Sequence, residues 1–92
     1  MTLKDTAGGE SGAGTVRVKA LGFLSTRLPG GRPVDLPVGS GGSLAVREAM
    51  RLAGLPEDEV FVIIVNGRKR VTADYLLARG DEVTFVPPVA GG

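Results

Sequence analysis

The alternation of apolar and polar residues predicts two strands in the N-terminal half of the chain. Residues 16–20 (VRVKA) alternate apolar and polar side chains, and residues 32–36 (RPVDL) alternate again with Val34 and Leu36 on one face. Both patterns are typical of strands with one buried face. Between them, residues 28–31 (LPGG) combine a proline that fixes one φ angle with glycines that supply positive φ angles. Pro33 has no N–H to donate, which suits an edge strand or the start of a strand. We therefore expect a hairpin.

One segment, residues 44–53, has the spacing of an amphipathic helix. Ser43 precedes it as a candidate N-cap, and Gly54 follows it as a left-handed stop, with Pro56 preventing continuation. Three apolar residues at positions i, i+4 and i+7 would form the buried stripe: Val46, Met50 and Ala53.

The apolar run of residues 60–65 (VFVIIV) leads into Asn66-Gly67, which is the strongest short signal for a hairpin because both turn residues need positive φ angles. A two-residue loop there pairs Val62 with Val71. Since Val71 is the only apolar residue of the return strand, this register directs one set of alternate residues into the core and the other outward. The inward set is Val60, Val62 and Ile64; the outward set is Phe61, Ile63 and Val65, beside Arg68 and Arg70. One extra residue in the loop would reverse the assignment.

The remaining pattern closes the fold. Residues 74–77 (DYLL) predict a helical turn that packs Leu76 or Leu77 against the core, and residues 82–86 (EVTFV) predict a last strand with Val83 and Phe85 inward. The last strand can lie parallel to the first, giving a mixed sheet of four to five strands with one helix packed across it. This is the β-grasp arrangement, an α+β fold.

The domain therefore spans residues 16–86. Residues 1–15 contain few apolar side chains and many Gly, Ser and Thr, and we expect a disordered arm because such a segment buries too little surface to offset its ordering entropy. Residues 87–92 are expected to form a flexible tail.

Composition narrows the classes of function. The chain has 92 residues and a net charge of +1, which argues against nucleic acid as a partner. It has no cysteine and no histidine, so a disulfide framework, a thiolate or imidazole metal site and a Cys–His nucleophile are excluded. No apolar run reaches the roughly 20 residues that span a bilayer, and no signal-peptide core is present. We expect a cytoplasmic protein with no membrane partner that is not an enzyme by itself.

The candidate chemistry lies at the C-terminus, Pro87-Pro88-Val89-Ala90-Gly91-Gly92. Six extended residues reach about 20 Å, the two prolines restrict the base of the tail, and the two glycines remove every side chain near the carboxylate. Such a backbone can enter a narrow channel in another protein and present its end group for reaction. The simpler interpretation is an inert end of a glycine-rich chain.

Val65-Asn66-Gly67 and residues 80–92 (GDEVTFVPPVAGG) resemble the ubiquitin-like sulfur carriers, which comprise the small subunit of molybdopterin synthase and the sulfur carrier of thiazole synthesis. The resemblance implies that a ubiquitin-activating-type enzyme adenylates the Gly92 carboxylate with ATP. A sulfur donor of the cysteine desulfurase or rhodanese type then forms a thiocarboxylate. An acceptor such as the large subunit of molybdopterin synthase takes the sulfur, and the carrier holds no permanent cofactor.

The ending is nearer to the molybdopterin branch, although residues 20–27 match it loosely. Carriers for thiamine thiazole, cysteine or tungsten-cofactor synthesis or tRNA thiolation have similar tails, and a ubiquitin-like modifier or an inert β-grasp module are further alternatives. Two sets of binding residues are expected. The channel residues are Pro87, Pro88, Val89, Ala90 and Gly91; the partner-docking residues are Phe61, Ile63, Val65, Arg68, Arg70 and Val86.

Overall fold

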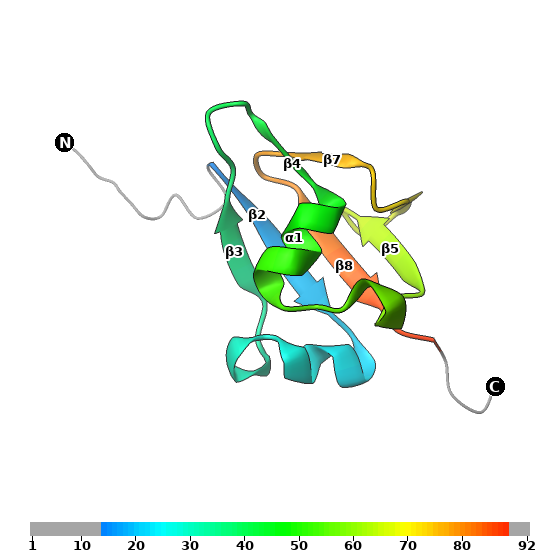
Figure 1. Cartoon of the computed structure of the whole chain (residues 1–92). Helices are drawn as coiled ribbons and strands as arrows, with labels where there is room; N and C mark the ends of the chain where they lie inside the picture. The colour runs from blue at the N-terminus through cyan, green and yellow to red at the C-terminus, as the bar shows by residue number, and fades with distance from the viewer. Residues whose placement is uncertain (1–13, 89–92) are drawn as a thin grey trace.

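The protein is a five-stranded mixed sheet with one α-helix across one face (Figure 1). The computed structural model describes residues 14–88. In spatial order the strands are β3 (Val34–Pro37), β2 (Thr15–Ala20), β8 (Glu82–Val86), β5 (Val62–Val65) and β6 (Lys69–Val71). The helix is α1 (Val46–Ala53), and β4 (Ser43–Ala45) and β7 (Leu76–Ala78) form a separate antiparallel pair. This is the expected β-grasp arrangement.

The centre of the sheet follows the expectation from sequence. β2 pairs with β3 in an antiparallel hairpin and with β8 in parallel, with Val18 opposite Val83. Val83 and Phe85 of β8 are fully buried, as predicted. The connection from β2 to β3 consists of two short 3-10 helices, η2 (Gly22–Arg27) and η3 (Pro29–Gly31). They lie at the end of the sheet where β2 and β8 end (Figure 1).

Helix α1 begins at Val46, two residues later than expected, because residues 43–45 form strand β4. Ser43 is therefore not the N-cap; Ala45 is, and it makes no side-chain cap. The N–H groups of Val46 and Arg47 donate instead to the carbonyls of Tyr75 and Ala73, at 2.9 and 3.0 Å. A backbone segment thus satisfies donors that a capping side chain would otherwise take.

The end of α1 and its buried stripe follow the prediction. Gly54 has φ 82°, and the N–H of Leu55 donates to the carbonyl of Met50 at 2.9 Å, which is the expected left-handed closure. Val46, Met50 and Ala53 are buried against the sheet.

The predicted register of the β5–β6 hairpin is wrong by one residue. Val65 pairs with Lys69 and Ile63 with Val71, so three residues separate the strands rather than two. Asn66 and Gly67 do take positive φ angles of 55° and 76°, but Arg68 is an additional loop residue. Ile63 lies opposite the buried Phe85 of β8, and directly opposed residues share a face. Ile63 and Val65 are accordingly buried, and Val62 and Ile64 point to the uncovered face.

Two further expectations need correction. Leu76 and Leu77 belong to strand β7 and not to a helical turn; Leu77 is buried opposite Leu44, whereas Leu76 is exposed. Thr15, assigned to the arm, is the first residue of β2. Residues 1–13 of the expected arm lie outside the described part of the chain. No helix within residues 14–88 is long and apolar enough to cross a membrane.

Candidate functional site

The C-terminal end of β8 is held from both neighbouring strands. The N–H of Phe61, just before β5, donates to the carbonyl of Val86 at 2.8 Å, and the N–H of Leu21, just after β2, donates to the carbonyl of Phe85 at 3.0 Å. These two bonds fix the backbone of β8, which lies between β2 and β5 (Figure 1), up to the last residue of the strand.

Pro87 lies on the backbone of Gly22. Pro87 is buried, whereas Pro88 is exposed. Gly22 has φ +55°, and a Cβ added to it would lie 3.1 Å from Cγ of Pro87. The Ser25 hydroxyl donates to the Gly22 carbonyl at 2.9 Å and holds this turn. The tail thus starts at Pro88 rather than at the expected Pro87.

Gly22 is a functional candidate that the sequence analysis missed. The available signal was a single glycine between two large apolar residues, Leu21 and Phe23, but its contact with Pro87 joins positions 65 residues apart. The remaining tail residues, Val89, Ala90, Gly91 and Gly92, lie outside the described part of the chain.

The expected docking surface is partly wrong. Ile63 and Val65 are buried on the face of the sheet that α1 covers, so they cannot contact a partner. Phe61 and Arg68 are exposed as expected, and Val86 is half-buried.

The uncovered face of the sheet carries apolar residues of β5 that the predicted register had placed in the core. Val62 lies opposite Val86, and Ile64 lies between Thr84 and Arg70 on neighbouring strands. Directly opposed residues share a face, so Val62, Ile64, Val86 and Arg70 form one continuous area, which we call the outer sheet patch.

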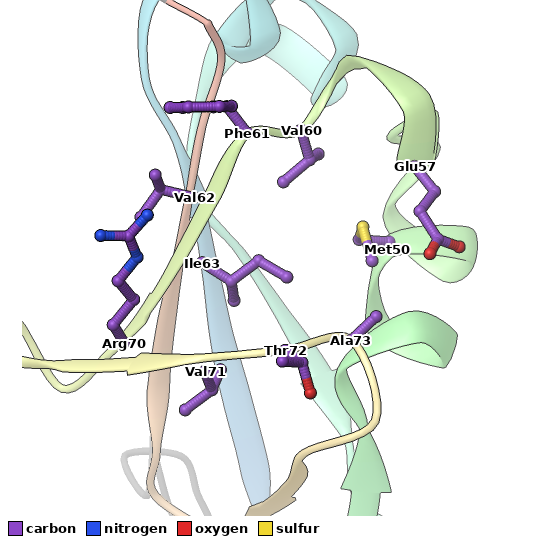
Figure 2. Close-up of a pocket in the computed structure, with 10 residues that line it drawn as sticks. All are labelled: Met50, Glu57, Val60, Phe61, Val62, Ile63, Arg70, Val71, Thr72 and Ala73. Atoms are coloured by element: carbon purple, nitrogen blue, oxygen red, sulfur yellow. The ribbon is translucent and has the colours of Figure 1, made fainter.

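A groove of about 360 Å³ opens on the other side of β5. Figure 2 shows Ile63 and Val60 pointing into it, with Met50 of α1 on the far wall and Phe61 at one end. Glu57 and Arg70 are the charged residues at its edge, and in Figure 2 the Arg70 side chain lies with Val62 on the opposite side of β5 from Ile63. Seven of the ten lining residues are apolar, but the surface that the groove exposes is more polar than apolar.

Arg47 on α1 forms ion pairs with two acidic residues on neighbouring segments. Its guanidinium donates to Asp74 at 2.7 Å and to Glu57 at 3.2 Å, and these hydrogen bonds raise the pKa of Arg47. Within residues 14–88, Arg68 and Arg70 make no ion pair, which leaves them available to an acidic surface. Those residues also contain no group of three or more metal ligands.

The fold and the fixed exit of β8 define a β-grasp protein of the ubiquitin-like class. The model of the ThiS family matches residues 36–92. The chain belongs to this family of ubiquitin-like sulfur carriers, which are small carrier proteins and not enzymes.

Solved structures agree on the fold. SAMP1 from Haloferax volcanii superposes with a TM-score of 0.64 at 24% identity, covering 86% of this chain and all of that one. Urm1 from Trypanosoma brucei superposes with a TM-score of 0.62 at 17% identity, covering 86% and 96% of the two chains. No curated protein sequence matches.

Proposed function

We propose that this protein carries sulfur as a thiocarboxylate on Gly92. The observation that carries the proposal is the rigid exit of β8, where Phe61, Leu21 and Gly22 fix the strand up to Pro87. Five residues follow Pro87 in the sequence, and the last two are Gly-Gly. A rigid base followed by a short arm without bulky terminal side chains suits delivery of one end group into another protein's channel.

The chemistry requires activation because a free carboxylate is a poor electrophile. In the proposed first step the Gly92 carboxylate attacks ATP, forming an acyl-adenylate and releasing pyrophosphate on a ubiquitin-activating-type enzyme. The terminal sulfur of a persulfide on a cysteine desulfurase or rhodanese-type donor then attacks the acyl carbon and displaces AMP, which gives an acyl disulfide. A second thiol of the partner enzymes cleaves this bond, so that the thiocarboxylate stays on Gly92 and the two enzyme sulfurs end as a disulfide. The carrier contributes the carboxylate and its placement, and ATP is bound by the activating enzyme.

Molybdopterin synthesis is the pathway we favour, because Pro87-Pro88 and the Gly-Gly end resemble that branch. The acceptor would then be a large subunit of molybdopterin synthase in the cytoplasm. Sulfur delivery to thiamine thiazole, cysteine, tungsten-cofactor or tRNA thiolation pathways uses the same carrier chemistry and is the alternative.

A second candidate function is protein modification, in which Gly92 forms an isopeptide with lysines of a target. It is favoured by the structural likeness to a chain described as small archaeal modifier protein 1, with a TM-score of 0.62 at 23% identity, covering 84% of this chain and all of that one. Mass spectrometry of the protein from its host separates the two functions. A mass increase equal to the exchange of oxygen for sulfur indicates the carrier, and branched lysine conjugates indicate the modifier.

The outer sheet patch is the docking surface that we propose for the partner enzymes. Val62, Ile64 and Val86 supply apolar contact, and Arg70, with Arg68 in the adjacent turn, supplies positive charge. Arginine is enriched in protein interfaces, and the fully buried core of an interface is more apolar than the rest of the surface.

Deleting Gly92 tests the proposed function. The deletion shortens the arm by about 3.5 Å, and misplacement of about 1 Å can already cost a hundredfold in rate. We expect a normal thermal melt but no ATP–pyrophosphate exchange with the host's adenylating enzyme.

Two matched variants sharpen this experiment. Adding one residue after Gly92 should abolish exchange in the same way, and Gly91→Val should fold normally and react poorly because a branched side chain enters the channel. Exchange at the parental rate by the deletion variant would overturn the carrier function.

A further inference from the structure

Large apolar side chains are exposed unevenly over the surface. Among residues 14–88 the exposed ones are Leu21 (47% exposed), Phe23 (52%), Leu52 (49%), Phe61 (67%) and Leu76 (60%). Three of the five, Leu21, Phe23 and Phe61, belong to the segments that surround the end of β8, and we call these three the exit collar. Exposed apolar groups gathered at one place mark interaction sites more reliably than scattered ones do.

The collar is tied to the start of the tail on both sides. Phe61 donates its backbone N–H to Val86, Leu21 donates its own to Phe85, and Phe23 follows the glycine on which Pro87 lies. Leu21 directly follows β2 and Phe61 directly precedes β5, and these two strands flank β8 (Figure 1).

The η2 segment that carries Phe23 is internally bonded. The N–H of Leu24, which is fully buried, donates to the Leu21 carbonyl at 3.1 Å, and the Thr26 hydroxyl donates to the Phe23 carbonyl at 2.7 Å. Leu21 and Phe23 are thus exposed on an ordered backbone whose neighbouring leucine is anchored in the core. A pre-ordered apolar surface loses little entropy on binding.

The length of the arm determines which protein meets the collar. Four residues follow Pro88, and fully extended they span about 13 Å. An enzyme that reacts with the Gly92 carboxylate must bring its reacting centre within that distance of Pro88. The rim of its channel must then lie close to Leu21, Phe23 and Phe61.

We infer that the exit collar binds an apolar rim around the tail channel of the adenylating enzyme, and that it is a contact separate from the outer sheet patch. The inference rests on the proposed function, since it is the reach of the reacting carboxylate that brings the two surfaces together. Aromatic side chains at the centre of an interface often carry a large share of its binding energy.

Pyrophosphate exchange measured against carrier concentration tests the inference. We compare Leu21→Ser, Phe23→Ser and Phe61→Ser with two matched controls, Leu52→Ser on α1 and Leu76→Ser on β7, whose side chains are similarly exposed elsewhere. Each collar variant should raise the KM for the carrier about tenfold, which corresponds to about 1.4 kcal/mol of binding. The kcat should stay at the parental value because the arm and its carboxylate are unchanged. Both controls should keep the parental KM.

Thermal melts check folding, and alanine versions replace any serine variant that melts early. The inference about the exit collar is overturned if the collar variants keep the parental KM, or if the controls raise KM as much as the collar variants do. Neither result affects the proposed carrier function. A wild-type protein that supports no exchange overturns the proposed function and the collar with it.

Discussion

The two ends of strand β8 are built from different chemistry. Where the chain enters β8, side chains close a polar network. The Asn66 amide donates to Asp81 at 3.1 Å, the N–H of Glu82 donates to Asn66 at 2.9 Å, and the N–H of Ala78 donates to Asp81 at 2.9 Å. Where the chain leaves β8, backbone bonds and the Gly22–Pro87 contact hold the strand, and the nearby large side chains are apolar and exposed.

The difference indicates which end of the molecule meets a partner. At the entry end the Asn66 and Asp81 side chains and the N–H groups of Ala78 and Glu82 satisfy one another. The buried Thr15 hydroxyl beside this turn is the exception, since it has no partner among the described residues. At the exit end the apolar side chains of Leu21, Phe23 and Phe61 are exposed to water. Covering them with another protein would remove this apolar surface from water, which is favourable. A carrier that works through its C-terminus is expected to have this asymmetry.

The largest expected effect concerns strand β5, whose two faces meet the core and the solvent. Ile63→Ala should lower the free energy of unfolding by about 2–4 kcal/mol because it leaves a cavity under the helix. Ile64→Ala, its neighbour on the uncovered face, should cost less than about 1 kcal/mol. Urea unfolding measures both, and equal losses would contradict the observed register.

The next effect tests the exit end. Gly22→Ala places a side chain at φ +55° and 3.1 Å from Pro87, and we expect a loss of about 2 kcal/mol, since a left-handed residue with a side chain costs roughly 1–2 kcal/mol before any clash. It should also lower kcat for pyrophosphate exchange, because the arm leaves in a changed direction.

Gly30→Ala is the matched control for this variant. Gly30 has φ +65° and no atom within 4 Å of an added Cβ, so it isolates the backbone strain. If both variants lose the same stability and both keep the parental kcat, the Pro87 contact does not position the arm.

A smaller effect is expected at the entry end. Asp81→Ala removes the acceptors for the Ala78 N–H and the Asn66 amide. The loss of these two bonds should cost about 1–2 kcal/mol, since each contributes about 0.5–1.5 kcal/mol net. It should leave pyrophosphate exchange unchanged. Asp58→Ala, in an exposed turn, is the control and should change stability by less than about 0.5 kcal/mol. A strong loss of exchange in Asp81→Ala would remove the functional contrast between the two ends.

The smallest effect lies on helix α1, away from both ends. The hydrogen bond from Arg51 lowers the pKa of Glu48 from its ordinary value of 4.5. A lowered folded-state pKa stabilises the fold above pH 4.5, and this contribution is lost as pH falls through the lowered pKa. Glu48→Gln should therefore lower the melting temperature slightly at pH 7 and not at all in acid. Arg51→Met should do the same, and a difference that persists in acid would contradict the ion-pair origin.

Interactions between near neighbours made much of this protein predictable from sequence. Three features depend only on residues a few positions apart: the period of two in β2 and β8, the end of α1 at Gly54, and the positive φ angles at Asn66 and Gly67. The end of α1 follows from the ability of Gly54 to adopt a positive φ angle. The tail is identified by its amino-acid sequence alone.

The failures concern contacts between distant segments. Local patterns did not show that Arg68 would be an additional loop residue, because the register of β5 is set by its pairing with β8. They also placed the start of α1 too early, since β7 draws residues 43–45 into a strand pair. The docking residues of β5 were misassigned because of the error in register, since a shift of one residue exchanges the two faces of a strand.

The sequence by itself determined the β-grasp order of elements and the terminal Gly-Gly arm, because backbone preferences and the periodicity of apolar residues act locally. Only the tertiary structure decided which face of β5 is buried, that Pro87 lies on Gly22, and that Leu21, Phe23 and Phe61 come from both sides of β8. Those features depend on segments that are far apart in the chain and meet only when the sheet is assembled.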